Sequence, residues 1–88
     1  KADCIMSDAW ISMGENNHDN KSSLFQNFQI NDNLMKQAKS NSLFMHCLPA
    51  HRSEEVTDSV IDGKSSIVWE QAKNRMFVQQ SILNFCIT

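Results

Sequence analysis

Two adjacent residues, His46 and Cys47, place an imidazole and a thiol at the end of a short apolar run. Such a pair could serve nucleophilic catalysis if the imidazole took the proton of the thiol. Adjacent residues of an extended strand point to opposite faces, however, so these side chains cannot readily hydrogen-bond each other. The sequence therefore argues against a Cys–His dyad. Cys47 is either a small core residue or a thiol exposed at the strand end beside Leu48 and Pro49.

Two further side chains, Asp8 and Arg75, carry charges that substrate binding and catalysis can use. The carboxylate of Asp8 can accept hydrogen bonds from an ammonium group. The guanidinium of Arg75 stays charged and donates several oriented hydrogen bonds, which suits it to stabilise negative charge. Each residue also has a structural interpretation, Asp8 as a polar strand terminus and Arg75 as a solvated helix residue.

Length and composition restrict the class of protein. The 88 residues form one small domain at most, and 41% hydrophobic with 20% charged residues is typical of a folded globular chain. A net charge of −2 with scattered Lys and Arg argues against nucleic-acid binding. No stretch approaches the roughly 20 apolar residues of a membrane helix, and the first residues lack the apolar run of a signal peptide. We therefore expect a soluble, cytoplasmic protein with no membrane partner.

The three cysteines, Cys4, Cys47 and Cys86, are odd in number and widely spaced, unlike a disulfide framework or a paired-cysteine zinc site. This usage fits a reducing, intracellular setting. A metal site built from Cys4, His46 and Cys47 is not supported by their spacing. Structural or solvent-exposed roles are expected for the three histidines, His18, His46 and His51. The chain also lacks an initiator methionine, which indicates a piece of a longer protein.

Three short apolar runs are typical of buried strands, at residues 4–6, 43–47 and 66–69. The first should end near Ser7 and Asp8. The second is stopped by Pro49, which has no amide for a central ladder. Residues 14–23 and 50–55 are polar and are expected to form solvated loops.

The segments between and after these runs favour helices. Asn31 or Asp32 can cap a helix that ends near Ser40, and Thr57 can cap a short helix through Ile61. Gly63 is placed to end that short helix in the left-handed conformation. From about residue 70 the apolar residues recur at helical spacing, which predicts a terminal amphipathic helix.

Strands that alternate with helices predict an α/β fold, a three-layer, Rossmann-like domain with a parallel sheet. Residues 1–88 are too short for a complete domain of that kind, so we expect an incomplete part of it. Ligands bind such sheets outside the carboxyl ends of the strands. That rule points to three segments: 8–14, 47–49 and 70–75.

Five motifs resemble those of the ornithine carbamoyltransferases of the aspartate/ornithine carbamoyltransferase family, and they follow one another along the chain in the order that the family has. His-Cys-Leu-Pro at 46–49 and Asp-Ala-Trp-Ile-Ser-Met-Gly at 8–14 are the most specific. The others are Phe-Gln-Ile-Asn at 28–31, similar to Tyr-Gln-Val-Asn; Glu-Val-Thr-Asp at 55–58; and Gln-Ala-Lys-Asn-Arg at 71–75, similar to Gln-Ala-Glu-Asn-Arg. The resemblance covers almost the whole chain, with departures at Phe28, at Lys73 and in the Asn-rich loop after Gly14.

The resemblance implies transfer of a carbamoyl group from carbamoyl phosphate to the side-chain amine of L-ornithine, giving L-citrulline and phosphate. No metal or organic cofactor is implied. By the same resemblance, ornithine is bound by Asp8, Ser12 and the Met13 amide. Cys47 lies beside the reacting amine and the carbamoyl group. The carbonyl of Leu48 accepts from the carbamoyl nitrogen, Arg75 faces the carbamoyl oxygen, and Pro49 follows a cis peptide bond.

The family also implies a first domain, which binds carbamoyl phosphate and is absent from these 88 residues, and a homotrimer. This chain would then be the C-terminal part of the ornithine-binding domain, hold half a site, and be inactive alone. The complete enzyme would act in arginine metabolism, in biosynthesis or breakdown, including the urea cycle. A putrescine carbamoyltransferase is disfavoured by Ser-Met-Gly at 12–14, and an aspartate carbamoyltransferase by Cys47, where that family has Pro. A non-catalytic remnant of the fold is the remaining alternative.

Overall fold

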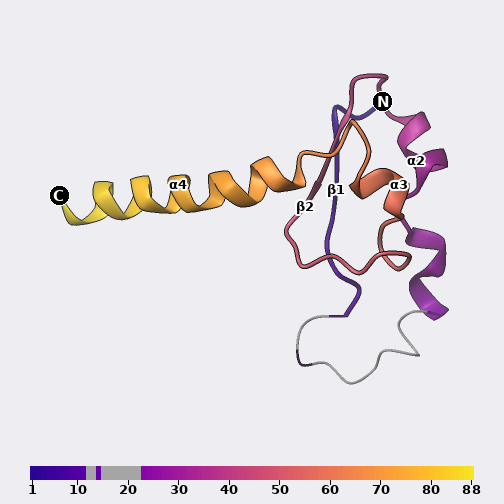
Figure 1. The fold of residues 1–88 in the computed structure, drawn as a ribbon, viewed down its shortest axis with the longest axis horizontal. Coiled ribbons are helices and arrows are strands. Elements are labelled where there is room, and N and C mark those ends of the chain that lie inside the picture. The colour runs from indigo at the N-terminus through magenta and orange to yellow at the C-terminus, as the bar shows by residue number, and fades with distance from the viewer. Residues whose placement is uncertain (12–13, 15–22) are drawn as a thin grey trace.

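The computed structural model describes residues 1–11, 14 and 23–88. Its two strands are β1 (Cys4–Ser7) and β2 (Leu43–His46), and its helices are η1 (Gln26–Phe28), α2 (Asp32–Gln37), α3 (Asp58–Ile61) and α4 (Val68–Ile87). Strands therefore alternate with helices along the chain, as the sequence predicts (Figure 1). Of the loop expected at 14–23, only Gly14 and Ser23 are described.

β1 and β2 form a parallel pair in the register Cys4 with Leu43 through Ser7 with His46. The first two predicted strands are thus confirmed within one residue, and both end at the same edge of the sheet. The residues that follow them, Asp8 and Cys47, come out side by side for this reason. A parallel pair requires a crossover connection, and α2 lies on that connection.

The prediction of a third strand at 66–69 is wrong. Only Ser66 bridges to Phe44, through hydrogen bonds that the Phe44 amide and carbonyl make with Ser65 and Ile67. The chain turns into α4 at Val68, whose side chain is completely buried. The apolar run therefore serves one bridge and one core contact rather than a ladder.

The predicted helices form with shifted ends. The side chain of Asn31 accepts a hydrogen bond from the Leu34 amide and caps α2, which ends at Gln37 rather than near Ser40. Thr57 precedes α3 as predicted, but its side chain makes no capping hydrogen bond. Figure 1 shows α2 and α3 on one side of the strand pair, while α4 leaves on the other side.

The prediction that Gly63 is left-handed is also wrong, since Gly14 is the only glycine of positive φ in the described chain. Gly63 is needed for space: a Cβ atom there would lie 2.5 Å from the backbone oxygen of Ser59. Its own amide donates to the Val60 carbonyl, which closes the last turn of α3. A glycine after a short helix can thus be required by close approach alone.

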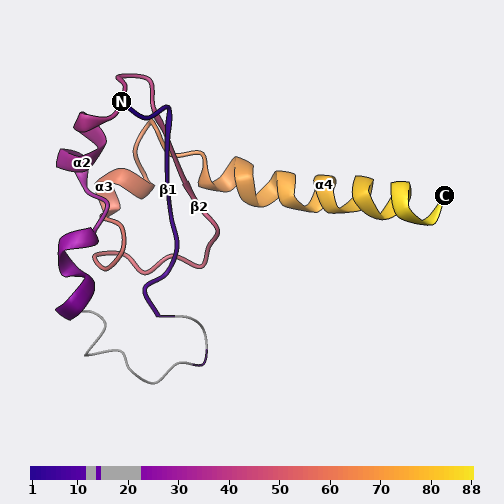
Figure 2. The ribbon, with the colours of Figure 1, turned by 180° about the vertical axis from the view of Figure 1, so that it is seen from behind.

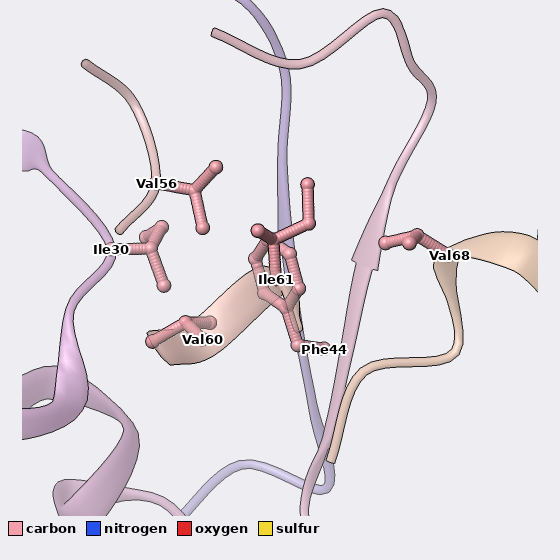
Figure 3. Packing of buried hydrophobic residues seen from close by; sticks show 6 residues of the cluster. All are labelled: Ile30, Phe44, Val56, Val60, Ile61 and Val68. Carbon is pink, nitrogen blue, oxygen red and sulfur yellow. The ribbon is translucent and has the colours of Figure 1, made fainter. Parts of the chain in front are cut away.

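The core is one cluster of six buried side chains (Figure 3). They come from β2, from α3, from the start of α4, and from the short segments that precede α2 and α3. Its members are Ile30, Phe44, Val56, Val60, Ile61 and Val68. Ile30 and Val56 are also joined by backbone hydrogen bonds, from the Ile30 amide to Glu55 and from the Thr57 amide to Ile30. The prediction of a solvated loop at 50–55 is therefore wrong at its end, because Glu55 is completely buried.

α4 extends away from this body (Figure 2). Its apolar residues beyond the first turn are exposed. The Cα radius of gyration is 15.3 Å, against about 12 Å for a compact chain of this length. The terminal helix is confirmed, but Val68 in its first turn is its one residue in the buried core cluster. Within the described residues, no helix combines the length and hydropathy needed to cross a membrane.

Candidate active site

The thiol of Cys47 donates a hydrogen bond of 3.0 Å to Oδ1 of Asp8. The same oxygen accepts from the Ala9 amide at 2.7 Å. Cys47 is exposed, so its interpretation as a core residue is wrong. The two predicted site residues are therefore in direct contact at the carboxyl edge of the sheet, although they lie 39 residues apart in the sequence.

This contact sets the ionisation of both groups. The hydrogen bond to Asp8, helped by partial burial, raises the pKa of the Cys47 thiol above its ordinary value. The hydrogen bonds from Cys47 and from the Ala9 amide lower the pKa of Asp8. Near neutral pH the pair is consequently a neutral thiol and a carboxylate. Because a thiolate is the nucleophilic form of cysteine, this arrangement suits a proton donor and argues against a covalent nucleophile.

His46 lies on the other face of β2 and is buried. Its Nδ1 accepts from the Leu48 amide at 2.8 Å, so the ring proton lies on Nε2, which donates to Oε1 of Glu55 at 2.9 Å. The adjacent imidazole and thiol therefore point apart, as the strand geometry predicts, and form no dyad. The structural interpretation of His46 is confirmed.

Leu48 leaves the strand with a φ of 49°, in the left-handed region, and is followed by a cis peptide bond to Pro49. The cis bond agrees with what the family resemblance implies. A non-glycine residue in the left-handed region is uncommon and is held there by its surroundings. For Leu48 these are the hydrogen bond to His46 and contact of its side chain with the core.

Arg75 lines a cavity of about 390 Å³ together with Met45, His46 and Cys47. α4 is fixed at this point by Gln71, whose Oε1 accepts from the His46 amide at 3.0 Å. Gln71 and Arg75 are four residues apart and so lie on the same face of the helix. The structure thus brings Arg75 to the cavity that Cys47 borders, as the strand-end rule predicts. Lys73 is exposed and is not among the residues that line this cavity.

Two residues predicted to bind ornithine, Ser12 and Met13, lie outside the described residues. Two residues with clear roles received no role from the sequence, namely Gln71 and Glu55. Glu55 begins the motif at 55–58 and Gln71 begins the motif at 71–75, and both motifs resemble the family. Their place in these motifs was the one sequence feature that could have indicated a role. Other motif residues are structural: Gln29 donates through Nε2 to the carbonyls of Ser53 and Glu54, at 3.0 and 2.9 Å.

The structure gives no support to a metal site at Cys4, His46 and Cys47. Cys4 pairs with Leu43 at the opposite end of the strands from Ser7 and His46, and both ring nitrogens of His46 are hydrogen-bonded. Among the described residues, the one group of three potential ligands is His51, Glu54 and Glu55. Oε1 of Glu55 already accepts from the His51 amide and from His46, so this group has a structural explanation.

Together, these groups offer an acceptor for an ammonium group at Asp8, a thiol donor at Cys47 and a guanidinium at Arg75. The sequence pattern of the family described as "Aspartate/ornithine carbamoyltransferase, Asp/Orn binding domain" matches residues 1–86. The chain belongs to this family. Carbamoyltransferases from other organisms resemble the chain in both sequence and fold.

A curated relative named ornithine carbamoyltransferase, from Nitrobacter winogradskyi, is 52% identical over 86 residues, which are 98% of this chain and 28% of the relative. The ornithine carbamoyltransferase structure from Pyrococcus furiosus superposes with a TM-score of 0.85 at 52% identity, over 93% of this chain and 26% of that one. The anabolic enzyme from Campylobacter jejuni gives 0.86 at 35% identity, over 94% and 28%. The chain therefore spans about 28% of the length of the curated relatives it matches.

Proposed function

We propose that this chain is the C-terminal, ornithine-binding part of an ornithine carbamoyltransferase. The complete enzyme transfers the carbamoyl group of carbamoyl phosphate to the side-chain amine of L-ornithine and releases L-citrulline and phosphate. The observation that carries the proposal is the contact between Asp8 and Cys47 at the ends of two parallel strands, beside the cavity lined by Arg75. Relatives of that name at 52% identity support it.

In the proposed reaction the neutral amine nitrogen of ornithine forms a bond to the carbonyl carbon and loses a proton, while the bond from that carbon to phosphate oxygen breaks and the departing phosphate takes up the proton. Asp8 accepts hydrogen bonds from the α-ammonium group of ornithine, while Ser12 and the Met13 amide hold the amino-acid end. The Leu48 carbonyl accepts from the carbamoyl nitrogen. Cys47, kept as a thiol by its hydrogen bond to Asp8, lies beside the reacting amine. Holding both substrates in one geometry lowers the entropic part of the barrier.

Arg75 stabilises the negative charge that develops on the carbonyl oxygen as the amine attacks. A guanidinium beside that oxygen does this more effectively than water, because its charge is permanent and its planar donors can form two hydrogen bonds at once. The cavity beside Cys47 gives that oxygen a place near the helix. Arg75 and Cys47 are therefore the proposed catalytic residues, and Arg75, Cys47 and Leu48 contact the carbamoyl phosphate.

The remaining features of the enzyme follow from the same proposal. A first domain outside these 88 residues holds the phosphate, and the present chain completes a three-layer, Rossmann-like second domain. The enzyme is a cytoplasmic homotrimer of arginine metabolism, and it uses no metal or organic cofactor. The 88 residues alone, with half a site, form no citrulline.

Citrulline formation by the full-length protein tests the proposal, with ornithine and putrescine as competing acceptors. We expect citrulline from ornithine and a much lower rate of carbamoyl transfer to putrescine. A preference for putrescine would overturn the assigned acceptor. Background rates with both amines would favour a non-catalytic remnant of the fold.

A further inference from the structure

Glu55 has a carboxylate that is completely buried and only half satisfied. Oε1 accepts from Nε2 of His46 at 2.9 Å and from the His51 amide at 2.7 Å, whereas Oε2 has no hydrogen-bond partner among the described residues. Burial of a carboxylate is unfavourable unless specific donors compensate it. A glutamine would offer the same acceptor without a charge. The position of this carboxylate therefore points to a role that involves its partner, His46.

His46 transmits the contact to the backbone of the candidate site. Because its Nε2 proton is held by Glu55, its Nδ1 is free of a proton and accepts from the Leu48 amide. A carboxylate behind an imidazole fixes the tautomer and the ring orientation and strengthens the other nitrogen as an acceptor. Glu55, His46 and Leu48 thus form a hydrogen-bonded chain that ends at a residue in the left-handed region.

We propose that Glu55 is a positioning residue for carbamoyl transfer. Through His46 it holds the Leu48 amide, and thereby fixes the direction of the Leu48 carbonyl and of the adjacent Cys47 thiol. This inference rests on the function proposed above, in which both groups meet the carbamoyl group.

The backbone of His46 connects these hydrogen bonds to α4, the helix that carries Arg75. Its amide donates to Gln71 of α4 at 3.0 Å, while its ring bonds Glu55 and Leu48. One buried residue is therefore common to the supports of Leu48, Cys47 and Arg75. Loss of the Glu55 contact is expected to displace the first two more than the third, since Gln71 binds the main chain of His46.

Two substitutions of Glu55 in the full-length protein separate positioning from mere packing. Glu55→Leu removes the acceptor, and a displacement of about 1 Å can lower kcat on the order of 100-fold. Glu55→Gln keeps an acceptor of the same shape and should restore kcat to within about tenfold of the parent. KM for ornithine should change less than kcat in both, because Asp8 is hydrogen-bonded to Cys47 and Ala9 and makes no hydrogen bond with Glu55, His46 or Leu48 among the described residues. A folded Glu55→Leu protein with parental kcat would overturn the proposal.

Val60→Ala is the matched control for lost stability, because Val60 is in the same buried cluster and makes no contact with His46 among those described. Its kcat, measured well below the unfolding temperature, should equal that of the parent. If Val60→Ala lowers kcat as much as Glu55→Leu does, the effect is one of stability and the proposal fails.

A cycle with His46→Leu tests the route of the effect. If Glu55 acts through His46, the double variant His46→Leu/Glu55→Leu should have the kcat of the slower single variant. Multiplied effects of the two substitutions would contradict a shared route.

NMR of the full-length protein tests the chain of contacts apart from activity. The parent and Glu55→Gln should show His46 protonated at Nε2 and a Leu48 amide protected from hydrogen exchange, and Glu55→Leu should lose that protection. If the parent forms no citrulline but shows these signals, the proposed function fails while the Glu55 contact stands. A parent with an unprotected Leu48 amide would refute the contact itself.

Discussion

The strand-end region and helix α4 are supported very differently. At the end of β2, two consecutive residues are hydrogen-bonded to other segments, His46 to Glu55 and Gln71, and Cys47 to Asp8. The Leu48 amide in turn donates to the ring of His46. In α4 only Val68 is buried, and Phe85 and Ile87 are 85% and 80% exposed. The position of Asp8 and Cys47 is therefore determined by contacts within this chain. The position of Arg75 depends on the single helical turn that separates it from Gln71, whose side chain accepts a hydrogen bond from the His46 amide.

Core truncation gives the largest difference between the two regions. Phe44→Ala removes a completely buried ring and should lower the free energy of unfolding by about 3–5 kcal/mol. Phe85→Ala, the matched change in α4, should alter it by less than about 0.5 kcal/mol. Denaturant unfolding monitored by circular dichroism measures both. Similar losses for the two variants would mean that α4 is packed as firmly as the core.

Removal of the guanidinium should have the next largest effect. Arg75→Ala in the full-length protein is expected to lower kcat by about 10²–10³-fold, since a charged donor for a developing oxyanion is lost. Lys73→Ala is the control, because Lys73 is outside the cavity lining and should keep kcat within about twofold. Steady-state citrulline formation compares them. An Arg75→Ala variant with unchanged kcat would remove Arg75 from the site.

The sequence was sufficient for the elements that local chemistry determines. A helix cap at Asn31 or Asp32, two strands correct to within one residue, and the opposite faces of His46 and Cys47 all follow from short-range rules, and the structure selects Asn31 as the cap. The cis bond before Pro49 came from the family resemblance.

Residues whose role depends on distant partners could not be predicted in this way. Glu55 is charged and stands in a polar segment, so only the fold reveals its burial against His46. The apolar run at 66–69 fits a strand equally well, and the choice of a helix at Val68 depends on core contact. Helical periodicity located α4, but periodicity alone does not specify what covers an apolar face.

The hydrogen bond between the His46 amide and Gln71, which holds α4, should contribute a smaller amount to the free energy of unfolding. Gln71→Ala leaves the His46 amide without its acceptor, at a cost of about 1 kcal/mol. Hydrogen exchange at His46 should become correspondingly faster, and kcat should fall if Arg75 moves. Gln80→Ala, an exposed glutamine on the same helix, is the control. Equal exchange rates at His46 in the two variants would show that Gln71 does not fix the helix.

The smallest expected effect is on the reactivity of Cys47. Since the hydrogen bond to Asp8 raises the pKa of this thiol, Asp8→Asn should lower that pKa and increase the thiolate fraction at mildly alkaline pH. Alkylation of Cys47, followed by mass spectrometry, should then become a few-fold faster, and the difference should vanish at high pH, where both proteins carry thiolate. Cys86, exposed on α4, serves as the internal reference. Slower alkylation in Asp8→Asn would reverse the sign of the assigned interaction.

Ornithine titration of the full-length protein with saturating carbamoyl phosphate tests the central claim, that the carboxyl edge of β1 and β2 is the ornithine half of a carbamoyltransferase site. The parent should form citrulline with saturable dependence on ornithine. Asp8→Ala should raise the KM for ornithine at least tenfold, because each lost charge-assisted hydrogen bond contributes about 1.5–3 kcal/mol. Absence of citrulline in the parent, or an unchanged KM in Asp8→Ala, would contradict the account.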